Sequence, residues 1–590
     1  MSSVIRVFDR QWTSGGILWN LVMSQQPDAG DMTKQGDHDF IIIGAGSAGC
    51  VVAEALSRDP SVSVLLLEAG PPDRNLMIHV PAGVYRAFRD RRINWNYVSQ
   101  PEPGLNGRRV PAPRGRVVGG SSAINSMVYM RGHPDDFDRW ERDHGLTGWG
   151  YADCLPYFKA AESYSRGGDE WRGGSGPLQV TRTDTHDPLY DAFLEAGKQA
   201  GQGSSDDLNG QHPEGVARYD ATKSRSRRCS AATAFLKPAL RRSNLTLETG
   251  AEVLALEIHA HRAEGVIFDQ RGERRVARAT REVILCGGAI NSPHLLMLSG
   301  IGPADHLREC GIPVATDLPG VGQNLRDHAK IKLQFACRKP LAFHRIGNPL
   351  VKAAAGVQWA LTGRGIATSN IWEAGGLIRG NHDIAYPNLQ YHFGPLGFTV
   401  DGDRITVNQA FSVNVDHARP RTTGHIALDP ANPQGAPRLH FNYLADADDL
   451  REMREGVARA RDLVAQPAFD AFRGAEMTPG ADCRTNEEIE AMLRERVETA
   501  FHPSCTCRMG HDELAVVDDQ FRVRGIEGLR VVDASALPEI TSANLNAPTM
   551  MIAARAADFI RNAPQLAPMR QEASRIRRDR VADQSPIASP

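Results

Sequence analysis

The stretch Asp39-Phe40-Ile41-Ile42-Ile43-Gly44-Ala45-Gly46-Ser47-Ala48-Gly49 decides the fold. Its apolar, β-branched run is typical of a buried parallel strand. Three glycines follow at once, then a helical run from Val51 to Ser57 and a second strand pattern from Val62 to Leu67 that ends at Glu68. Strand, glycine turn, helix, strand and acid in one unit predict a dinucleotide-binding βαβ fold.

Each part of this unit has a physical role. Gly44 permits the tight turn, Gly46 lets the backbone approach a pyrophosphate, and Gly49 lets the helix pack on the strand. The helix N-terminus offers free amides to the phosphates. Glu68 would accept hydrogen bonds from ribose hydroxyls, which disfavours NADP but does not separate FAD from NAD. The candidate cofactor residues here are Gly44, Gly46, Ser47, Ala48, Gly49, Glu68 and Ala69.

Composition narrows the class of protein. The chain has 590 residues, 41% of them hydrophobic, which predicts several domains or a large two-lobed enzyme. A net charge of -2 argues against nucleic-acid binding. Nine cysteines without paired metal spacing indicate a reducing compartment and no metal site. We find no signal peptide and no apolar run near the about 18 residues that span a membrane, so we expect a cytoplasmic protein.

The two ends of the chain differ from its middle. Residues 1–37 precede the main body of the first predicted strand and are interpreted as an N-terminal extension. Translation starts at Met1, Met23 and Met32 all stay open. Residues 564–590 are polar and charged, which predicts a disordered tail.

Two segments near the end of the chain carry the chemistry. The first is Phe501-His502-Pro503-Ser504-Cys505-Thr506-Cys507-Arg508-Met509-Gly510. The second is Ser542-Ala543-Asn544-Leu545-Asn546-Ala547-Pro548-Thr549. A positioned histidine can take a proton from an alcohol near neutral pH, and an amide can stabilise the alkoxide that develops. We therefore expect His502 and Asn546 to be the catalytic pair of a redox enzyme that acts on alcohols.

Two further motifs carry a resemblance to a known family. The segment from Arg114 to Asn125 resembles the first signature of the glucose-methanol-choline (GMC) oxidoreductases. Gly287 to Pro293, continuing through Ser299-Gly300-Ile301-Gly302, resembles the second. With the two C-terminal segments, the similarity runs from about Asp39 to Ile560, and its wording is closest to the choline dehydrogenase-like branch.

The resemblance implies an α/β protein with the GMC fold. One part is a Rossmann-like FAD-binding domain, and the other is a substrate domain with a mostly antiparallel sheet and helices. We place the FAD-binding domain, which is discontinuous, at 38–150, 215–335 and 500–563. The substrate-binding domain then covers 151–214 and 336–499.

The same resemblance implies bound FAD and names more contacts. Trp95, Val118, Gly119, Asn125 and Val128 would lie along the flavin; Val253 would contact adenine; Asp533 and Ala534 would meet the central part of the cofactor. Asp533 could instead cap a helix. Some members attach FAD to a histidine in the first signature. Ile124 occupies that position here and cannot form the bond, so we predict non-covalent FAD.

The reaction implied is oxidation of a small primary alcohol to the aldehyde by hydride transfer to flavin N5. The resemblance favours a dehydrogenase over an oxidase and leaves a quinone, a cytochrome and oxygen open as electron acceptors. It also allows peripheral contact with the inner face of a membrane, although we identify no anchor in the sequence. The non-redox alternative is a hydroxynitrile lyase-like enzyme, which shares the fold and keeps FAD.

One charge reversal bears on the substrate. Choline-oxidising relatives carry a D-H-x-E pattern, whereas this chain has Asp327-His328-Ala329-Lys330. A lysine repels choline and suits an anionic alcohol such as isethionate. Two alternatives stay open: a neutral aliphatic or aromatic alcohol, and choline itself. Lys330 could also point to solvent or pair with an acid such as Glu373.

Overall fold

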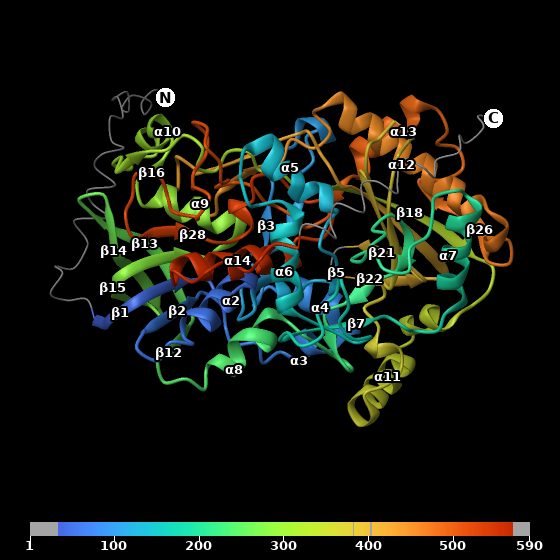
Figure 1. Ribbon diagram of the computed structural model, residues 1–590. Helices are drawn as coiled ribbons and strands as arrows, with labels where there is room; N and C mark the ends of the chain where they lie inside the picture. The colour runs from blue at the N-terminus through green and yellow to red at the C-terminus, as the bar shows by residue number, and fades with distance from the viewer. Residues whose placement is uncertain (1–32, 382, 402–403, 570–590) are drawn as a thin grey trace, which may run out of the picture.

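The computed structural model describes residues 33–381, 383–401 and 404–569. Two seven-stranded sheets lie side by side, with a group of helices between them in the view of Figure 1. The predicted N-terminal extension lies outside the described residues up to position 32, and its last residues, 33–37, belong to the first strand. Among the described residues, no helix combines the length and the apolar character needed to cross a membrane.

The first sheet contains the predicted dinucleotide-binding unit. Its strands run in the order β12-β2-β1-β15-β14-β13, and β28 pairs with β15. The pairs around β1 are parallel, and β13, β14 and β15 form an antiparallel extension. Ile41, Ile42 and Ile43 of β1 and all of β2 are buried, as expected for a parallel sheet covered on both faces. The strands are β1 (Thr33–Ile43), β2 (Val64–Glu68), β12 (Leu245–Thr249), β13 (Ala251–His259), β14 (Arg262–Gln270), β15 (Glu273–Leu285) and β28 (Leu529–Val531).

The second sheet is antiparallel throughout, as the resemblance implied. Its order is β26-β18-β23-β20-β19-β8, and β27 pairs with β18. Helices α12 (Ala447–Ala465) and α7 (Pro188–Gln199) pack against it. Its strands are β8 (Gly215–Arg218), β18 (Ala329–Cys337), β19 (Ala374–Ile378), β20 (Leu389–Gly394), β23 (Ala410–His417), β26 (Arg473–Thr478) and β27 (Glu498–Thr499).

The structure corrects two of the predicted domain boundaries. The predicted FAD-binding segment 215–335 included β8 and most of β18, but both strands hydrogen-bond within the second sheet.

Side chains alternate between the two faces of β18, so Lys330 and Lys332 project from the same face of this strand. Part of the predicted disordered tail, residues 564–569, is described by the structure. Before the end of the described residues, Met569 N–H donates to the Ala152 carbonyl of α6 (Tyr151–Ala161) at 2.9 Å. Residues 570–590 lie outside the described residues.

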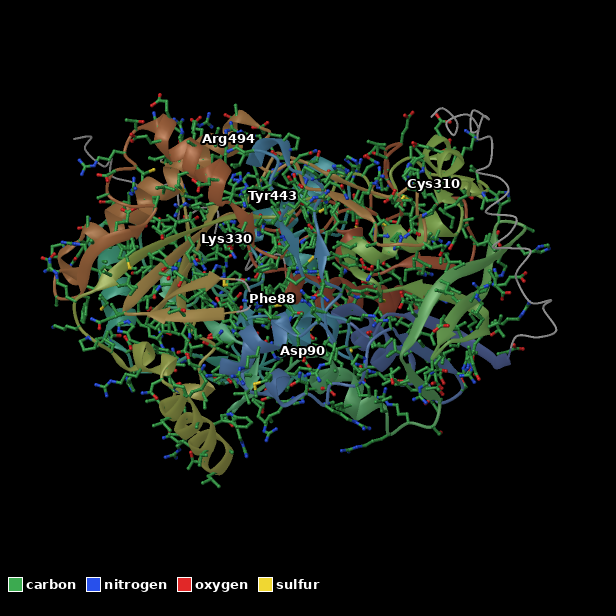
Figure 2. The ribbon with its side chains drawn as sticks, turned by 180° about the vertical axis from the view of Figure 1, so that it is seen from behind. Phe88, Asp90, Cys310, Lys330, Tyr443 and Arg494 are labelled. Atoms are coloured by element: carbon green, nitrogen blue, oxygen red, sulfur yellow. The ribbon has the colours of Figure 1, made fainter. Side chains whose placement is uncertain are left out.

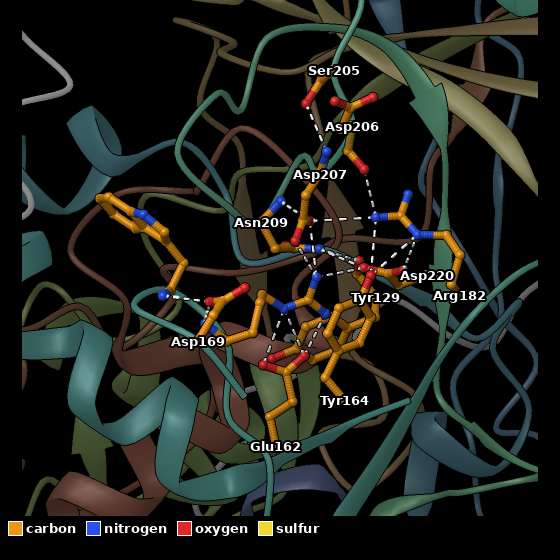
Figure 3. Close-up of polar contacts among 12 residues, drawn as sticks. Tyr129, Glu162, Tyr164, Asp169, Arg182, Ser205, Asp206, Asp207, Asn209 and Asp220 are labelled. Carbon is orange, nitrogen blue, oxygen red and sulfur yellow. Dashed lines mark hydrogen bonds and ion pairs between the residues drawn. The ribbon is translucent and has the colours of Figure 1, made fainter. Parts of the chain in front are cut away.

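A buried ion cluster joins strands β6 (Glu162–Tyr164) and β7 (Leu178–Arg182), which belong to a smaller, four-stranded sheet (Figure 3). The Arg172 guanidinium contacts Glu162 at 2.5 Å, Asp207 at 2.7 Å and Asp220 at 2.8 Å. Arg131 and Arg182 bring the cluster to three cations and three carboxylates. Asp220 belongs to β9 (Asp220–Ala221), which pairs with β5 (Val128–Tyr129). The cluster therefore fixes the strand that carries Val128 toward the site described next.

Candidate active site

One cavity of about 1700 Å³ runs from the glycine turn of the first sheet to His502. Pockets for a single small ligand hold roughly 300–1,000 Å³. This cavity is larger, so it has room for a dinucleotide and a small substrate together. Helices α2 (Ser47–Leu56) and α14 (Asn546–Ile560), which pack on each other, both begin at its wall.

The glycines of the first turn have the geometry that the sequence predicted. Gly44 has φ +101°, and a Cβ there would lie 2.6 Å from the Cys286 carbonyl oxygen. A Cβ on Gly49 would lie 1.9 Å from the Gly44 oxygen, so this glycine lets helix and strand touch. A Cβ on Gly46 would meet nothing closer than 4.0 Å. Gly46 thus borders open space, which fits a site where a pyrophosphate approaches the backbone.

Glu68 lies on the cavity wall at the end of β2. Its carboxylate accepts hydrogen bonds from Ala45 N–H at 2.9 Å and Gly70 N–H at 2.8 Å. Burial raises the pKa of Glu68 to about 7, against the lowering effect of these two donors. Each carboxylate oxygen has a second lone pair for a ribose hydroxyl. The residues at this end of the cavity therefore fit the adenosine half of FAD.

Most of the other predicted cofactor residues also reach the cavity. Its wall includes Gly44, Gly46, Ser47, Ala48, Glu68, Ala69, Trp95, Asn125, Val128, Val253, Asp533 and Ala534. Gly49, Val118 and Gly119 do not line it. Gly119 instead donates its N–H to the Ala45 carbonyl at 2.7 Å, and this hydrogen bond stabilises the glycine turn.

Asp533 caps a helix, which was the alternative considered for it, and it also lines the cavity. Its carboxylate caps the short helix η8 (Ala534–Ala536) through Ser535 N–H, and it also accepts from Gly288 N–H at 2.8 Å and Ser292 Oγ at 2.6 Å. Gly288 begins α9 (Gly288–Leu298), the helix of the second signature. Burial raises the pKa of Asp533, and these hydrogen bonds oppose that rise. Asp533 thus connects the start of η8 to the helix of the second signature at the wall of the cavity.

The amide beside His502 is Asn544, not the predicted Asn546. Asn544 Nδ2 lies 3.1 Å from His502 Nε2, and both side chains border the cavity. Asn546 is the first residue of α14, and its Oδ1 accepts from Ser47 Oγ at 2.8 Å. Asn546 therefore faces the cofactor end. The signal for Asn544 was present in the same Asn-Leu-Asn run, but the sequence alone does not choose between two asparagines two positions apart.

A chain of hydrogen bonds fixes the orientation of the Asn544 amide. Tyr219 donates its hydroxyl hydrogen to the Tyr391 carbonyl at 2.5 Å. The Tyr219 oxygen can then only accept from Gln390 Nε2, which lies 3.3 Å away. The same Nε2 donates to Asn544 Oδ1 at 3.1 Å. Asn544 must therefore present its NH₂ group to His502, and His502 Nε2 must be an acceptor.

The other side of the His502 ring is held by a second histidine. His502 Nδ1 lies 2.9 Å from His328 Nδ1. The backbone N–H of His502 donates to Asp327 Oδ1 at 2.7 Å. Burial lowers the pKa of His502 well below its usual value, and the charge of His328 lowers it further. Burial also lowers the pKa of His328 to about 4. His502 is therefore neutral at pH 7, with the lone pair of Nε2 directed toward the cavity side.

Lys330 lines the same cavity as His502. In the view of Figure 2 it lies in the interior of the molecule, between Tyr443 and Phe88. Its side chain is only 14% exposed, so it does not point to solvent. Its Nζ lies 4.6 Å from the ring centroid of Phe501 and 3.5 Å from Glu498. Glu373, considered as a partner from the sequence, instead pairs with Arg218 at 3.0 Å.

A second lysine, which sequence reasoning did not count as a site residue, accompanies Lys330. Lys332 also lines the cavity, and its Nζ lies 4.2 Å from the ring centroid of Phe398. Burial lowers the pKa of Lys332. Two aromatic faces that could otherwise receive a cationic head group are therefore covered by ammonium groups of the protein itself.

Comparison with known proteins finds matches over most of the chain. Models of the GMC oxidoreductase family match residues 38–330 and 420–553. The chain is 45% identical to an oxygen-dependent choline dehydrogenase of Burkholderia cenocepacia (strain HI2424), over 90% of this chain and 94% of that protein. It is 44% identical to the mitochondrial choline dehydrogenase of Mus musculus, over 96% of this chain and 97% of that protein.

Solved structures show the same architecture. A pyridoxine 4-oxidase from Mesorbium loti superposes with a TM-score of 0.79 at 31% identity, covering 88% of this chain and 98% of its own. A variant of the formate oxidase of Aspergillus oryzae RIB40, studied for FAD modification, superposes with a TM-score of 0.82 at 26% identity, covering 90% and 99% of the two chains.

Proposed function

The chain belongs to the GMC oxidoreductase family, and on that premise we propose that it is a dehydrogenase that oxidises a small primary alcohol to the aldehyde. The enzyme acts on CH–OH donors and uses FAD, which accepts the hydride from the carbinol carbon when it is bound. The observation that carries the proposal is the convergence of His502 Nε2 and Asn544 Nδ2, 3.1 Å apart, at the cavity.

The two side chains suit the two demands that an alcohol makes on the protein. A substrate hydroxyl that replaces their direct hydrogen bond donates its hydrogen to His502 Nε2 and accepts a hydrogen bond from Asn544 Nδ2. As the hydroxyl proton leaves, Nε2 holds it and the amide stabilises the negative charge on oxygen. Because His502 is buried and neutral, it is competent as a base without first losing a proton.

We further propose that the far end of the substrate is anionic, as in isethionate. Lys330 and Lys332 both line the cavity and lie over aromatic rings. The Glu498 side chain opposite Lys330 is 61% exposed, so solvent weakens its neutralising effect. Choline is the second candidate, because the relatives with 45% and 44% identity are named choline dehydrogenases.

A charge swap at Lys330 tests the head group. Lys330→Glu should raise KM for isethionate by about tenfold to a hundredfold, because each 1.4 kcal/mol of lost attraction is tenfold. It should also improve choline as a substrate. Lys330→Met separates lost charge from reversed charge, and Lys339→Glu is the matched control, since Lys339 also lies over an aromatic ring but is exposed. An unchanged ratio of isethionate to choline turnover in Lys330→Glu would contradict the anionic assignment.

A further inference from the structure

Helix α11 (Pro349–Thr362) projects from the body of the molecule (Figure 1). Its ends are well defined: Asn348 Oδ1 accepts from Leu350 N–H at 2.9 Å, and Gly363 closes the helix with φ +63°. Of the residues of this helix, all of which the structure describes, only Trp359 is buried. The helix is therefore a regular element that contributes little to the core it stands on.

The apolar face of α11 points away from the protein. Leu350, Val357 and Leu361 are 80%, 59% and 81% exposed, and their spacing of i, i+7 and i+11 places them on one side of a helix. Trp359 lies on the opposite side, where its Nε1 donates to the Ser226 carbonyl at 2.8 Å. A surface helix normally buries its apolar stripe and exposes its polar one. On α11 the stripe of Leu350, Val357 and Leu361 is exposed instead, which marks this face as a contact surface.

The surroundings of this face are basic. The sequence has no Asp or Glu from His328 to Trp372. Exposed basic residues lie on α11, beside it, and in the β10–β11 hairpin (Lys223–Arg228) that receives Trp359. We call them the basic collar: Arg225, Arg227, Arg345, Lys352 and Arg364.

We propose that α11 and the basic collar dock this enzyme on a membrane surface that contains anionic lipids. A short helix with leucines on one side and cations around it lies in the plane of the headgroups rather than across the bilayer. Each exposed Lys or Arg near an anionic leaflet adds to the attraction. A second copy of the chain fits less well, because a two-fold contact through α11 would bring one basic collar against the other. The proposal does not depend on the identity of the alcohol.

Vesicle co-sedimentation of the FAD-loaded enzyme tests the proposal. The vesicles are phosphatidylcholine alone or phosphatidylcholine with phosphatidylglycerol. We expect binding to the anionic vesicles only, reduced by added salt. The double variant Leu350→Glu/Leu361→Glu should weaken binding by about tenfold or more, because it removes two inserted leucines and adds like charge to the anionic surface. Leu514→Glu is the matched control, since Leu514 is 48% exposed and lies outside α11.

The outcomes distinguish a membrane surface from a second copy of the chain as the partner of this helix face. Loss of vesicle binding in the double variant, with flavin absorbance and turnover of a soluble dye acceptor unchanged, supports membrane docking. Equal binding of wild type and double variant would overturn it, as would failure of the wild type to bind anionic vesicles. A wild-type dimer in light scattering that becomes a monomer in the double variant would assign the face to self-association instead.

Discussion

Nδ1 of His328 lies 2.9 Å from Nδ1 of His502, so the two rings share a single hydrogen between them. One ring must accept where the other donates, and a second hydrogen between the two Nδ1 atoms would set two N–H donors against each other and make one ring a buried cation. Asn544 already donates to His502 Nε2. The arrangement therefore keeps the active-site base neutral, and Nε2 can take the substrate proton once a substrate hydroxyl replaces its hydrogen bond from Asn544.

The pH dependence of the reaction follows from this pair. Activity requires neutral His502, and burial with the charge of His328 lowers the pKa of His502 well below 6.5. As pH falls, kcat/KM should therefore stay level through pH 6.5 and drop only well below it. In His328→Asn one of the lowering charges is gone, so the acidic limb should move to higher pH. His511→Asn, at an exposed position, is the control; a limb that stays in place in His328→Asn contradicts the pairing.

The two asparagines should have different phenotypes. Asn544→Ala removes the donor next to His502 Nε2 and should lower kcat by about 10²–10³-fold, the usual cost of one donor to a developing oxyanion. Asn546→Ala removes the contact with Ser47 and should weaken FAD retention more than turnover of the loaded enzyme. Comparing kcat per bound flavin in the two variants checks both. The assignment fails if Asn546→Ala is the variant that loses the chemical step.

Gln390 is expected to act through Asn544. Its Nε2 holds Asn544 Oδ1 at 3.1 Å, so Gln390→Leu frees the amide to rotate. We expect kcat to fall by about tenfold to a hundredfold with little change in KM, as for a group that orients a functional side chain. The double variant with Asn544→Ala should be no slower than Asn544→Ala alone. Additive losses would mean that Gln390 acts by another route.

The ion cluster around Arg172 should contribute strongly to the stability of the four-stranded sheet on which it lies. Arg172→Met leaves Glu162 and Asp220 buried with fewer partners and should lower the free energy of unfolding by about 3–5 kcal/mol. Arg92→Ala is the control, because its side chain is 83% exposed and solvent screens its ion pair with Asp90, so a much smaller loss of stability is expected. Thermal unfolding of both variants with FAD bound makes the comparison, and equal shifts in Tm would contradict it.

The flavin should leave the protein on unfolding. Ile124 is buried on the cavity wall and has no group that can bond to the flavin ring. Acid denaturation should therefore release all of the flavin into the supernatant as unmodified FAD, measured by chromatography and mass spectrometry. Flavin that stays with the precipitated chain would contradict the prediction.

The sequence predicted the parts of the site that are local. The glycine turn, β2 and Glu68 are defined by a short run whose spacing has a direct geometric meaning, and the structure has them as expected. Asn544 and Asn546 differ only in how the chain enters α14, which depends on packing against α2. Gln390 reaches Asn544 from more than 150 positions away, so no local pattern indicates it. The domain boundaries were inexact for a similar reason, since the partner strands of β18 all follow it in the chain.

Anaerobic reduction of the bound FAD, followed by absorbance, tests the central claim most directly. Wild type and His502→Ala, matched for FAD content, are mixed with isethionate, choline and a neutral primary alcohol side by side. The account predicts that isethionate bleaches the wild-type flavin fastest and that His502→Ala is slower by roughly 10²–10⁴-fold, the usual contribution of a general base. Equal rates in the two proteins, or no bleaching by any alcohol, would contradict it.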